Sequence, residues 1–265
     1  MTDKTLDAVL AIATEAGGRI MEIYSSDFAV TRKDDESPLT QADLAAHSHI
    51  SAELTRQWPQ IPVLSEEAAD IPFTTRASWT RYWLVDPLDG TKEFIKRNGE
   101  FTVNIALIDQ GRPVLGVVYA PALGLTYLAE HGSGAFRIKE GRREKITTRK
   151  VPAKPALVVS KSHRDAALEA FLAKMPLHDA VSRGSSLKFC LVAEGSADLY
   201  PRTGPTSEWD TGAGHCVAEQ AGAQVLKLPD FSPLLYNQKD SLLNPNFVVI
   251  GDPAYSWRDK LPVDG

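Results

Sequence analysis

The chain has 265 residues, of which 43% are hydrophobic and 24% charged, so it can bury a large core in one or two domains. Its formal net charge of −5 has the wrong sign for a general nucleic-acid-binding protein. Only Cys190 and Cys216 are present, and residues 1–5 lack the pattern of a signal peptide, so we expect a cytoplasmic protein without a disulfide framework.

The first ninety residues are predicted to form two helices and two short strands. Apolar residues at helical spacing predict a helix over residues 4–24, and a second helix is expected from about Thr40 to Trp58. Apolar runs that close on acidic residues predict strands within residues 61–67 and 82–86. We therefore expect each strand to end at a carboxylate.

The pattern changes after Phe101. Short apolar runs separated by Gly and Pro predict an antiparallel meander up to Ile146. Strands and helices then alternate, with strands expected at residues 157–160, 198–200, 225–228 and 247–250, and helices at 165–174, 187–193 and 211–221. This change predicts an α+β subdomain over residues 1–150 and an α/β subdomain over residues 151–265.

Four acidic residues stand at expected strand ends or at a helix start: Glu66, Asp86, Asp89 and Asp210. Oxygen ligands without a cluster of His or Cys favour Mg²⁺ over zinc. In the Asp86–Asp89 segment, the proline is expected to bend the chain so that both carboxylates and the Leu88 carbonyl face a pair of ions. A solvated turn would explain any one of these acids, but not the whole set.

Two further positions have competing explanations. Gly90-Thr91 is expected to open a helix whose free N–H groups favour a phosphate. Thr40-Gln-Ala-Asp43 matches a capping box, so the local sequence alone favours Asp43 as a helix cap.

Four motifs together resemble the inositol monophosphatase superfamily over almost the whole chain. They are Ser37-Pro-Leu-Thr-Gln-Ala-Asp43, Ser65-Glu-Glu67, Trp83-Leu-Val-Asp-Pro-Leu-Asp-Gly-Thr91 and Glu208-Trp-Asp-Thr-Gly-Ala-Gly214. The resemblance implies an α+β and α/β fold, layered as an αβαβα sandwich, and a phosphomonoesterase that uses two or three Mg²⁺ ions. Gly212 departs from the pattern, because the family usually has alanine there.

The resemblance also implies a role for each matching residue. The ions would be held by Glu66, Asp86, the Leu88 carbonyl, Asp89 and Asp210. Gly90, Thr91 and Asp210 would bind the substrate at its scissile phosphate. Asp43 and Thr91, with Glu66, would form the catalytic group around the attacking water.

Within the superfamily, the chain is most similar to the 3′(2′),5′-bisphosphate nucleotidases. Besides Lys92-Glu-Phe94, three later segments carry this likeness: Ser160-Lys-Ser-His163, Gly184-Ser-Ser-Leu-Lys188 and Tyr200-Pro-Arg202. The implied substrate is adenosine 3′,5′-bisphosphate, hydrolysed to AMP, with its 5′-phosphosulfate precursor as a second candidate. The substrate's other anionic group would need donors away from the metals, for which we expect His163, Ser185, Lys188 and Arg202.

Local explanations compete with these four assignments, since Lys188 could be a solvated helix residue, Arg202 a surface ion-pair partner, and His163 and Ser185 helix caps. The main alternative is therefore an inositol or sugar monophosphatase with the same metal site. A catalytically silent module that senses nucleotide or lithium is a third hypothesis, and the complete set of acids argues against it.

The expected partner is a small nucleotide, and not a nucleic acid. The apolar runs are shorter than the roughly 18 residues of a membrane span, so no integral membrane segment is expected. No amphipathic basic helix supports peripheral attachment to the inner membrane. A monomer and a homodimer are both compatible with the sequence.

Overall fold

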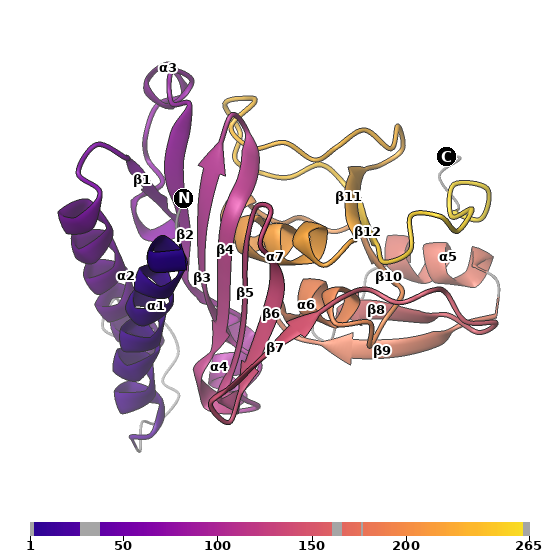
Figure 1. Cartoon of the computed structure of the whole chain (residues 1–265), viewed down its shortest axis with the longest axis horizontal. Coiled ribbons are helices and arrows are strands. Elements are labelled where there is room, and N and C mark those ends of the chain that lie inside the picture. Colours follow the sequence, from indigo (N-terminus) through magenta and orange to yellow (C-terminus); the bar gives the residue numbers. More distant parts are fainter. Residues whose placement is uncertain (1–2, 27–37, 161–165, 176, 262–265) are drawn as a thin grey trace.

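A computed structural model describes residues 3–26, 38–160, 166–175 and 177–261 of the chain. The elements stack in layers (Figure 1): two helices, a seven-stranded sheet, two central helices, a five-stranded sheet and one outer helix. This arrangement confirms the predicted αβαβα sandwich.

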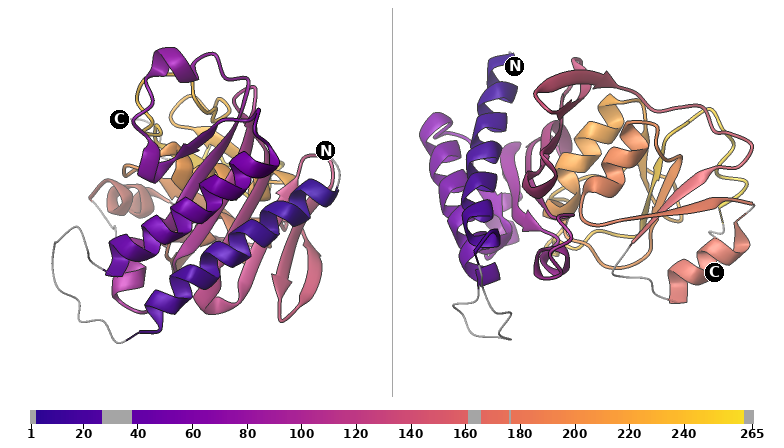
Figure 2. Two further views of the ribbon diagram at one scale, coloured as in Figure 1. Left: turned by 90° about the vertical axis from the view of Figure 1, so that its left-hand side faces the viewer. Right: turned by 90° about the horizontal axis from the view of Figure 1, so that it is seen from below.

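Helices α1 (Asp3–Tyr24) and α2 (Pro38–Gln57) lie side by side on one face of the first sheet, as Figure 2 shows. Their apolar faces are buried against strand residues, with Leu6 and Ile50 in one cluster with Trp83. Both helices confirm the predicted ones. Because α2 begins at Pro38, Asp43 lies inside the helix, so the capping explanation for Asp43 is wrong.

The first sheet has its strands in sequence order, with β1 parallel to β2 and every later neighbour antiparallel. The strands are β1 (Val63–Ser65), β2 (Arg81–Asp89), β3 (Thr102–Asp109), β4 (Arg112–Ala120), β5 (Leu125–Glu130), β6 (Gly134–Lys139) and β7 (Arg142–Ile146). The predicted meander is confirmed, but strand β7 was not foreseen. It is a polar edge strand in which only Ile146 is buried, so no apolar run marks it.

Strand β2 corrects one expectation. It does not end at Asp86 but continues through Pro87 and Leu88 to Asp89, with a shift in its pairing register between Asp86 and Asp89. A proline is tolerated at such an irregularity, where the ladder of hydrogen bonds is already interrupted.

Four short helices connect the strands of this half: η1 (Glu66–Ala68), α3 (Phe73–Arg76), α4 (Thr91–Ile95) and η2 (Pro121–Leu123). Helix α4 follows Gly90 directly, which confirms that Gly90-Thr91 opens a helix.

The second sheet has the order β11-β12-β10-β8-β9, and its outer face carries α5 (Ala166–Lys174). Its strands are β8 (Ala156–Ser160), β9 (Asp179–Arg183), β10 (Leu199–Arg202), β11 (Gln224–Lys227) and β12 (Phe247–Ile250). Strand β9 is largely exposed, and the sequence did not predict it. The predicted boundary near residue 150 falls between the two sheets, and its status as a domain boundary stays a prediction.

Helices α6 (Leu187–Ala193) and α7 (Glu208–Gln220) fill the layer between the sheets. Helix α7 begins three residues earlier than predicted, so Asp210 lies in its first turn. A Cβ atom on Gly214 would come within 2.8 Å of the Phe189 ring, and one on Gly212 within 2.9 Å of Leu84 Cδ2. Both contacts show that the small residues of α7 allow close packing against α6 and β2.

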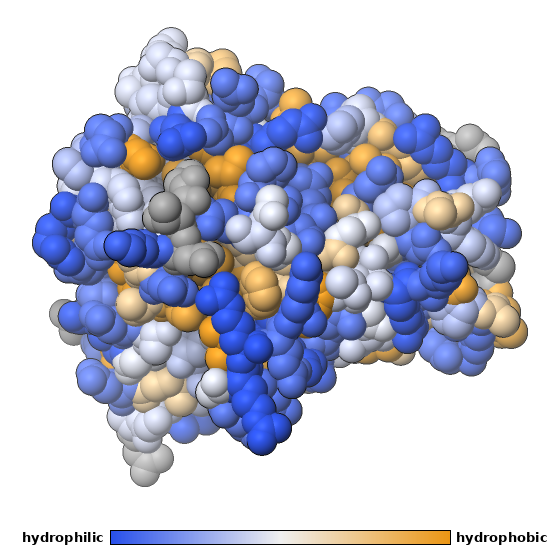
Figure 3. Space-filling view, viewed as in Figure 1, coloured by the Kyte–Doolittle hydropathy of each residue, from blue (hydrophilic) through white to orange (hydrophobic). Residues whose placement is uncertain are grey.

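The face shown in Figure 3 is largely hydrophilic, with apolar side chains mainly in its recesses. Within the ranges that the structure describes, no helix has the length and apolar character to cross a membrane.

Candidate active site

The parallel pairing of β1 and β2 brings acidic residues to one edge of the first sheet. Glu66 begins η1 directly after β1, while Asp86 and Asp89 occupy the corresponding end of β2. The first turn of α7 adds Asp210 from the other half of the chain. Asp86 is close enough to the other three for their charges to affect its pKa. The structure thus gathers the four acids that the sequence singled out.

Asp86 is the most deeply buried of these acids, with 1% of its surface exposed. Its Oδ1 accepts a hydrogen bond from the backbone N–H of Leu88, at 3.1 Å. Burial raises its pKa well above the ordinary value, and the charges of Asp89 and Glu66 raise it further. Its ionised form is therefore less favourable than in water, and a nearby positive charge would offset this cost.

Asp89 is held through one carboxylate oxygen. Its Oδ2 accepts hydrogen bonds from the Ser186 backbone N–H at 2.7 Å, from Ser186 Oγ at 3.0 Å and from Asn104 Nδ2 at 3.4 Å. Burial raises the pKa of Asp89, while the charge of Lys188 and these hydrogen bonds lower it. Asp89 is consequently anchored from both halves of the chain.

Asp210 combines a structural contact with its place in the site. It accepts a hydrogen bond from the Ser207 backbone N–H at its Oδ2, at 2.8 Å, as the acidic partner of a capping box on α7. Burial and then the charge of Asp89 raise its pKa to about 7. Its other carboxylate oxygen is not part of this cap.

Asp43 reaches the cluster from α2. It is 9% exposed, and burial, then the charges of Glu67 and Glu66, raise its pKa to about 8. Among the described residues, its Oδ1 has no hydrogen-bond partner. Partial burial also raises the pKa of Glu66, although the side chain keeps solvent contact at the rim of the site.

The chemistry of this donor set fits a hard cation. Crowded carboxylates with raised pKa values would each be stabilised as anions by a nearby positive ion, and oxygen ligands suit Mg²⁺. Within the described part of the chain, no group of three or more His, Cys, Asp or Glu side chains lies in an arrangement that could by itself hold a metal ion. Mg²⁺ keeps several waters and needs only one or two carboxylates besides a substrate phosphate, so an open arrangement is compatible with it.

Gly90 controls the approach between the carboxylates and the second half of the chain. Its φ angle is +97°, a left-handed conformation that favours glycine, and a Cβ atom there would collide with Ser185 Oγ. Thr91 follows as the first residue of α4 and faces the same pocket. The Gly90–Thr91 backbone therefore lines the same pocket as Asp89.

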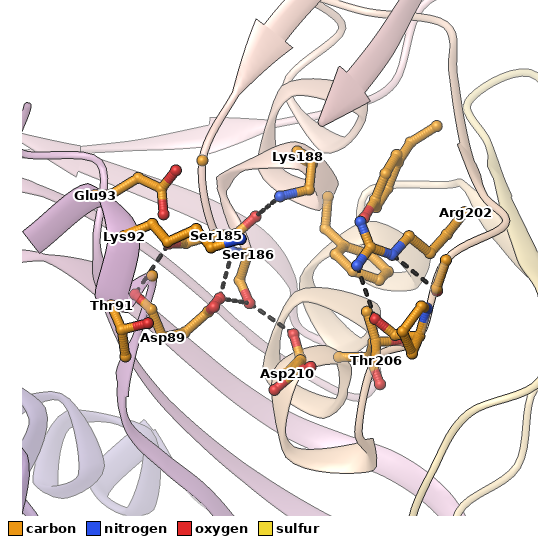
Figure 4. Close-up of a pocket in the computed structure, with 17 residues that line it drawn as sticks. Asp89, Thr91, Lys92, Glu93, Ser185, Ser186, Lys188, Arg202, Thr206 and Asp210 are labelled. Atoms are coloured by element: carbon orange, nitrogen blue, oxygen red, sulfur yellow. Dashed lines mark hydrogen bonds between the residues drawn. The ribbon is translucent and has the colours of Figure 1, made fainter. Parts of the chain in front are cut away.

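One pocket of about 570 Å³ joins these groups to the second half of the chain (Figure 4). The predicted site residues along its wall are Asp89, Gly90, Thr91, Ser185, Lys188, Arg202 and Asp210. Figure 4 places Asp89 and Thr91 on one side of the pocket and Arg202 on the other. Four other predicted residues are not part of this wall: Asp43, Glu66, Asp86 and Leu88. Three of them still interact, because the charge of Glu66 raises the pKa of both Asp43 and Asp86.

The three predicted nucleotide-binding residues in the pocket already contact the backbone. Ser185 Oγ lies within hydrogen-bond distance of the Asp89 and Glu100 carbonyls, at 2.9 and 2.8 Å. Lys188 is 8% exposed and donates to the Ser185 carbonyl at 2.6 Å. Arg202 donates to the carbonyls of residues 204 and 205. Each cation has further N–H donors.

Burial lowers the pKa of Lys188 to about 8, while the charge of Asp89 opposes this shift. The nearby carboxylate offsets only part of the charge of this buried ammonium group. The remaining positive charge would attract a bound phosphate. His163, which the sequence also suggested, lies outside the described residues.

Sequence reasoning missed two residues that support the acids. Asn104 on β3 is fully buried beside Asp89 and has no local motif. Ser186 lies within the quoted Gly184–Lys188 segment, but nothing in its local pattern separates it from Ser185. The Ser207-x-x-Asp210 spacing of a capping box was visible in the sequence and would have placed the start of α7 correctly.

Comparison with known proteins gives a consistent result. The 3′(2′),5′-bisphosphate nucleotidase CysQ of Escherichia coli (strain K12) is 54% identical over 248 residues, which cover 92% of this chain and 98% of that protein. The CysQ of Haemophilus influenzae is 39% identical over 261 residues, 97% of each chain. A crystal structure of CysQ from Bacteroides thetaiotaomicron has a TM-score of 0.86 and 42% identity, covering 94% of this chain and 97% of that one.

The model of the inositol monophosphatase family matches residues 1–251, nearly the whole chain. With the layered fold and the gathered acids described above, this match leads to one conclusion: the chain belongs to the inositol monophosphatase family.

Proposed function

We propose that this protein is a metal-dependent 3′(2′),5′-bisphosphate nucleotidase that removes the 3′-phosphate of adenosine 3′,5′-bisphosphate and leaves AMP. One observation carries the proposal: one pocket is lined by the carboxylates Asp89 and Asp210 and by the cations Lys188 and Arg202, with Asp89 and Arg202 on opposite sides of it (Figure 4). A substrate with two phosphates needs both regions, whereas a monophosphate needs only the first. The identity of 54% to a protein named as this nucleotidase supports the same substrate class.

In this mechanism one set of residues would hold the ions and another would bind the scissile phosphate. Bound Mg²⁺ would offset the substrate charge, make water a nucleophile at neutral pH and stabilise the leaving oxygen. Glu66, Asp86, Asp89, Asp210 and the Leu88 carbonyl would hold the ions. The N–H groups at Gly90 and Thr91 would orient the scissile phosphate.

Asp43 is the proton acceptor that the geometry supports best. Its Oδ1 is buried and has no hydrogen-bond partner among the described residues, so it retains an acceptor site for a bound water molecule. Its raised pKa makes it a stronger base than an ordinary carboxylate. Thr91 and Glu66 would position that water between Asp43 and the phosphorus atom.

Lys188 and Arg202 would bind the phosphate that does not react. Binding energy gained at this remote group positions the reacting one, so it can raise kcat as well as affinity. An inositol or sugar monophosphate lacks that second group in the same place, and this difference distinguishes the alternative function.

The finer features of the proposal are two or three Mg²⁺ ions per site, a small nucleotide as the only required partner, and action in the cytoplasm. Calorimetric titration of the protein with Mg²⁺, after bound metal has been removed with a chelator, would give the number of ions bound per chain. A single binding event per chain would contradict the multi-ion site.

The deciding experiment compares phosphate release from adenosine 3′,5′-bisphosphate, inositol 1-phosphate and fructose 1,6-bisphosphate at one Mg²⁺ concentration. We expect the highest kcat/KM for the nucleotide. A higher value for inositol 1-phosphate or the sugar bisphosphate would replace the nucleotidase by the alternative function.

A further inference from the structure

The turn between β9 and α6 connects the two halves of the active site through Ser186. This residue is 2% exposed and precedes α6, in the half of the chain that contributes the second sheet. Its backbone N–H and its hydroxyl both contact Asp89 Oδ2, at 2.7 and 3.0 Å. Asp89 belongs to β2 in the other half.

The same hydroxyl also reaches the first turn of α7. Ser186 Oγ lies 2.7 Å from the backbone carbonyl of Asp210. A serine hydroxyl carries a single proton, so at any moment it donates either to the Asp89 carboxylate or to the Asp210 carbonyl. Both acceptors belong to residues that the proposed function assigns to the metal site, and they come from different halves of the chain.

Asn104 fixes the orientation of this hydroxyl. Its Nδ2 donates to Ser186 Oγ at 2.9 Å and lies 3.4 Å from Asp89 Oδ2. Asn104 is fully buried on β3, directly opposite Asp86 in the strand register. The donated bond occupies a lone pair of Ser186 Oγ, so its proton is directed toward the two remaining acceptors.

The contacts to Asp89 all fall on its Oδ2. The Ser186 backbone N–H and Asn104 Nδ2 approach this oxygen, joined by the Ser186 hydroxyl when it donates to Asp89, so they restrict the rotation of the carboxylate plane and leave Oδ1 for an interaction on the other side. Buried donors that hold a ligand in this way typically change metal affinity or activity by about 10- to 100-fold when removed.

We propose that Ser186 is a positioning residue that holds the Asp89 carboxylate and the first turn of α7 at a fixed separation for cation binding. The inference rests on the proposed function only for its premise that Asp89 and Asp210 bind the cation. Ser186 also lines the pocket, but in the proposed role it acts through Asp89 and the first turn of α7 and not through the reacting atoms.

The test measures Mn²⁺ binding to the nucleotide-free protein by electron paramagnetic resonance, for the wild type, Ser186→Ala and Ser186→Thr. Removal of the hydroxyl should weaken Mn²⁺ binding about tenfold or more. Threonine retains the hydroxyl and should restore most of the affinity. Ser196→Ala is the matched control, because Ser196 is exposed and its hydroxyl bonds the Glu194 side chain, which is not part of the site, so this variant should bind Mn²⁺ as the wild type does.

Circular dichroism and thermal unfolding accompany each variant. If Ser186→Ala does not fold, Ser186→Cys takes its place, since it keeps the shape with a weak donor and should show a similar loss. A folded Ser186→Ala or Ser186→Cys protein with wild-type Mn²⁺ affinity would overturn the proposal, as would a threonine variant that folds yet binds as weakly as alanine.

Activity measurements separate this proposal from the proposed function. If Ser186→Ala weakens Mn²⁺ binding but the wild type does not hydrolyse adenosine 3′,5′-bisphosphate, the positioning role stands and the nucleotidase assignment fails. If the wild type hydrolyses it and Ser186→Ala has unchanged metal affinity and unchanged kcat/KM, the nucleotidase assignment stands and the positioning role fails.

Discussion

Asp89 illustrates how one side chain serves both the fold and the proposed chemistry. Its Oδ2 is occupied by donors from Ser186 and Asn104, while its pKa is raised by burial. A group of this kind is held in one rotamer by the protein and retains one oxygen for a ligand.

Asp89→Asn should keep this shape while removing one negative charge. We expect turnover to fall by about a thousandfold, because a ligand charge worth roughly 4 kcal/mol in the transition state corresponds to that factor. Phosphate release at saturating Mg²⁺ measures the effect, and circular dichroism verifies the fold. A variant with more than about a tenth of wild-type turnover would falsify the assignment of Asp89 as an ion ligand.

Arg202→Ala should reduce hydrolysis of the bisphosphate substrate more than hydrolysis of a monophosphate. Loss of a charge-assisted contact of about 1.5–3 kcal/mol corresponds to a 10- to 100-fold lower kcat/KM for adenosine 3′,5′-bisphosphate. A ribose monophosphate that carries only the scissile group should be affected little. Equal losses on both substrates would instead place Arg202 at the scissile phosphate or in the fold, where it already contacts the carbonyls of residues 204 and 205.

At the scale of elements, the segment that joins the two sheets is fixed by a buried carboxylate. Asp198, just before β10, accepts hydrogen bonds from Arg149 Nε and Nη2 at 2.8 and 2.7 Å, and from the Ala156 backbone N–H at 2.7 Å. The Asp198 side chain is fully buried, whereas that of Arg149 is 41% exposed. This contact ties the connecting segment to the start of β8.

Asp198→Asn should therefore lower the free energy of unfolding by about 2 kcal/mol, since it weakens charge-assisted bonds at a buried site. Urea unfolding measures the change. Asp179→Asn is a suitable control, because Asp179 pairs with Lys154 at an exposed position and should change stability by less than about 0.5 kcal/mol. Equal effects of the two substitutions would contradict a special role for the buried pair.

At the scale of the whole molecule, the acidic cluster makes stability depend on pH and on metal. Burial raises the pKa of Asp210 from 3.8 to about 7 in the folded, metal-free protein. The folded state thus binds this proton more tightly than the unfolded chain does. Its contribution to stability is complete below pH 4 and is lost as the pH rises toward 7.

The protein in EDTA should accordingly unfold more easily at pH 8 than at pH 6, and Mg²⁺ should stabilise it more at pH 8. A ligand at 100 times its dissociation constant adds about 2.7 kcal/mol of stability. Thermal unfolding with and without Mg²⁺ at both pH values measures this linkage. An identical stabilisation by Mg²⁺ at pH 6 and pH 8 would argue against ion binding that displaces protons from this cluster.

Metal exchange tests the same site through catalysis. EDTA should abolish phosphate release, and Mg²⁺ should restore it. Excess Ca²⁺ should inhibit, because its longer bonds and looser coordination disturb the geometry that Mg²⁺ imposes. The family resemblance implies inhibition by Li⁺ as well. Full activity in EDTA would be incompatible with a metal-dependent mechanism.

Much of the fold was predictable because periodic burial leaves its trace in local sequence. The spacing of Leu6 and its neighbours predicts α1, and the apolar runs of the meander predict β3 to β6. Strands β7 and β9 were missed, since both are largely exposed edge strands without an apolar run of their own.

The candidate site divides in the same way. The sequence by itself determined which carboxylates are candidates, because the residue types and spacing of the Asp86–Thr91 and Glu208–Gly214 motifs restrict the chemistry to oxygen ligation and phosphate binding. Only the tertiary structure decided that Asp43 faces the cluster instead of capping its helix, and that Ser186 and Asn104 hold Asp89. These contacts join residues from different helices and strands, and no local pattern encodes a contact that forms only after those elements have packed together.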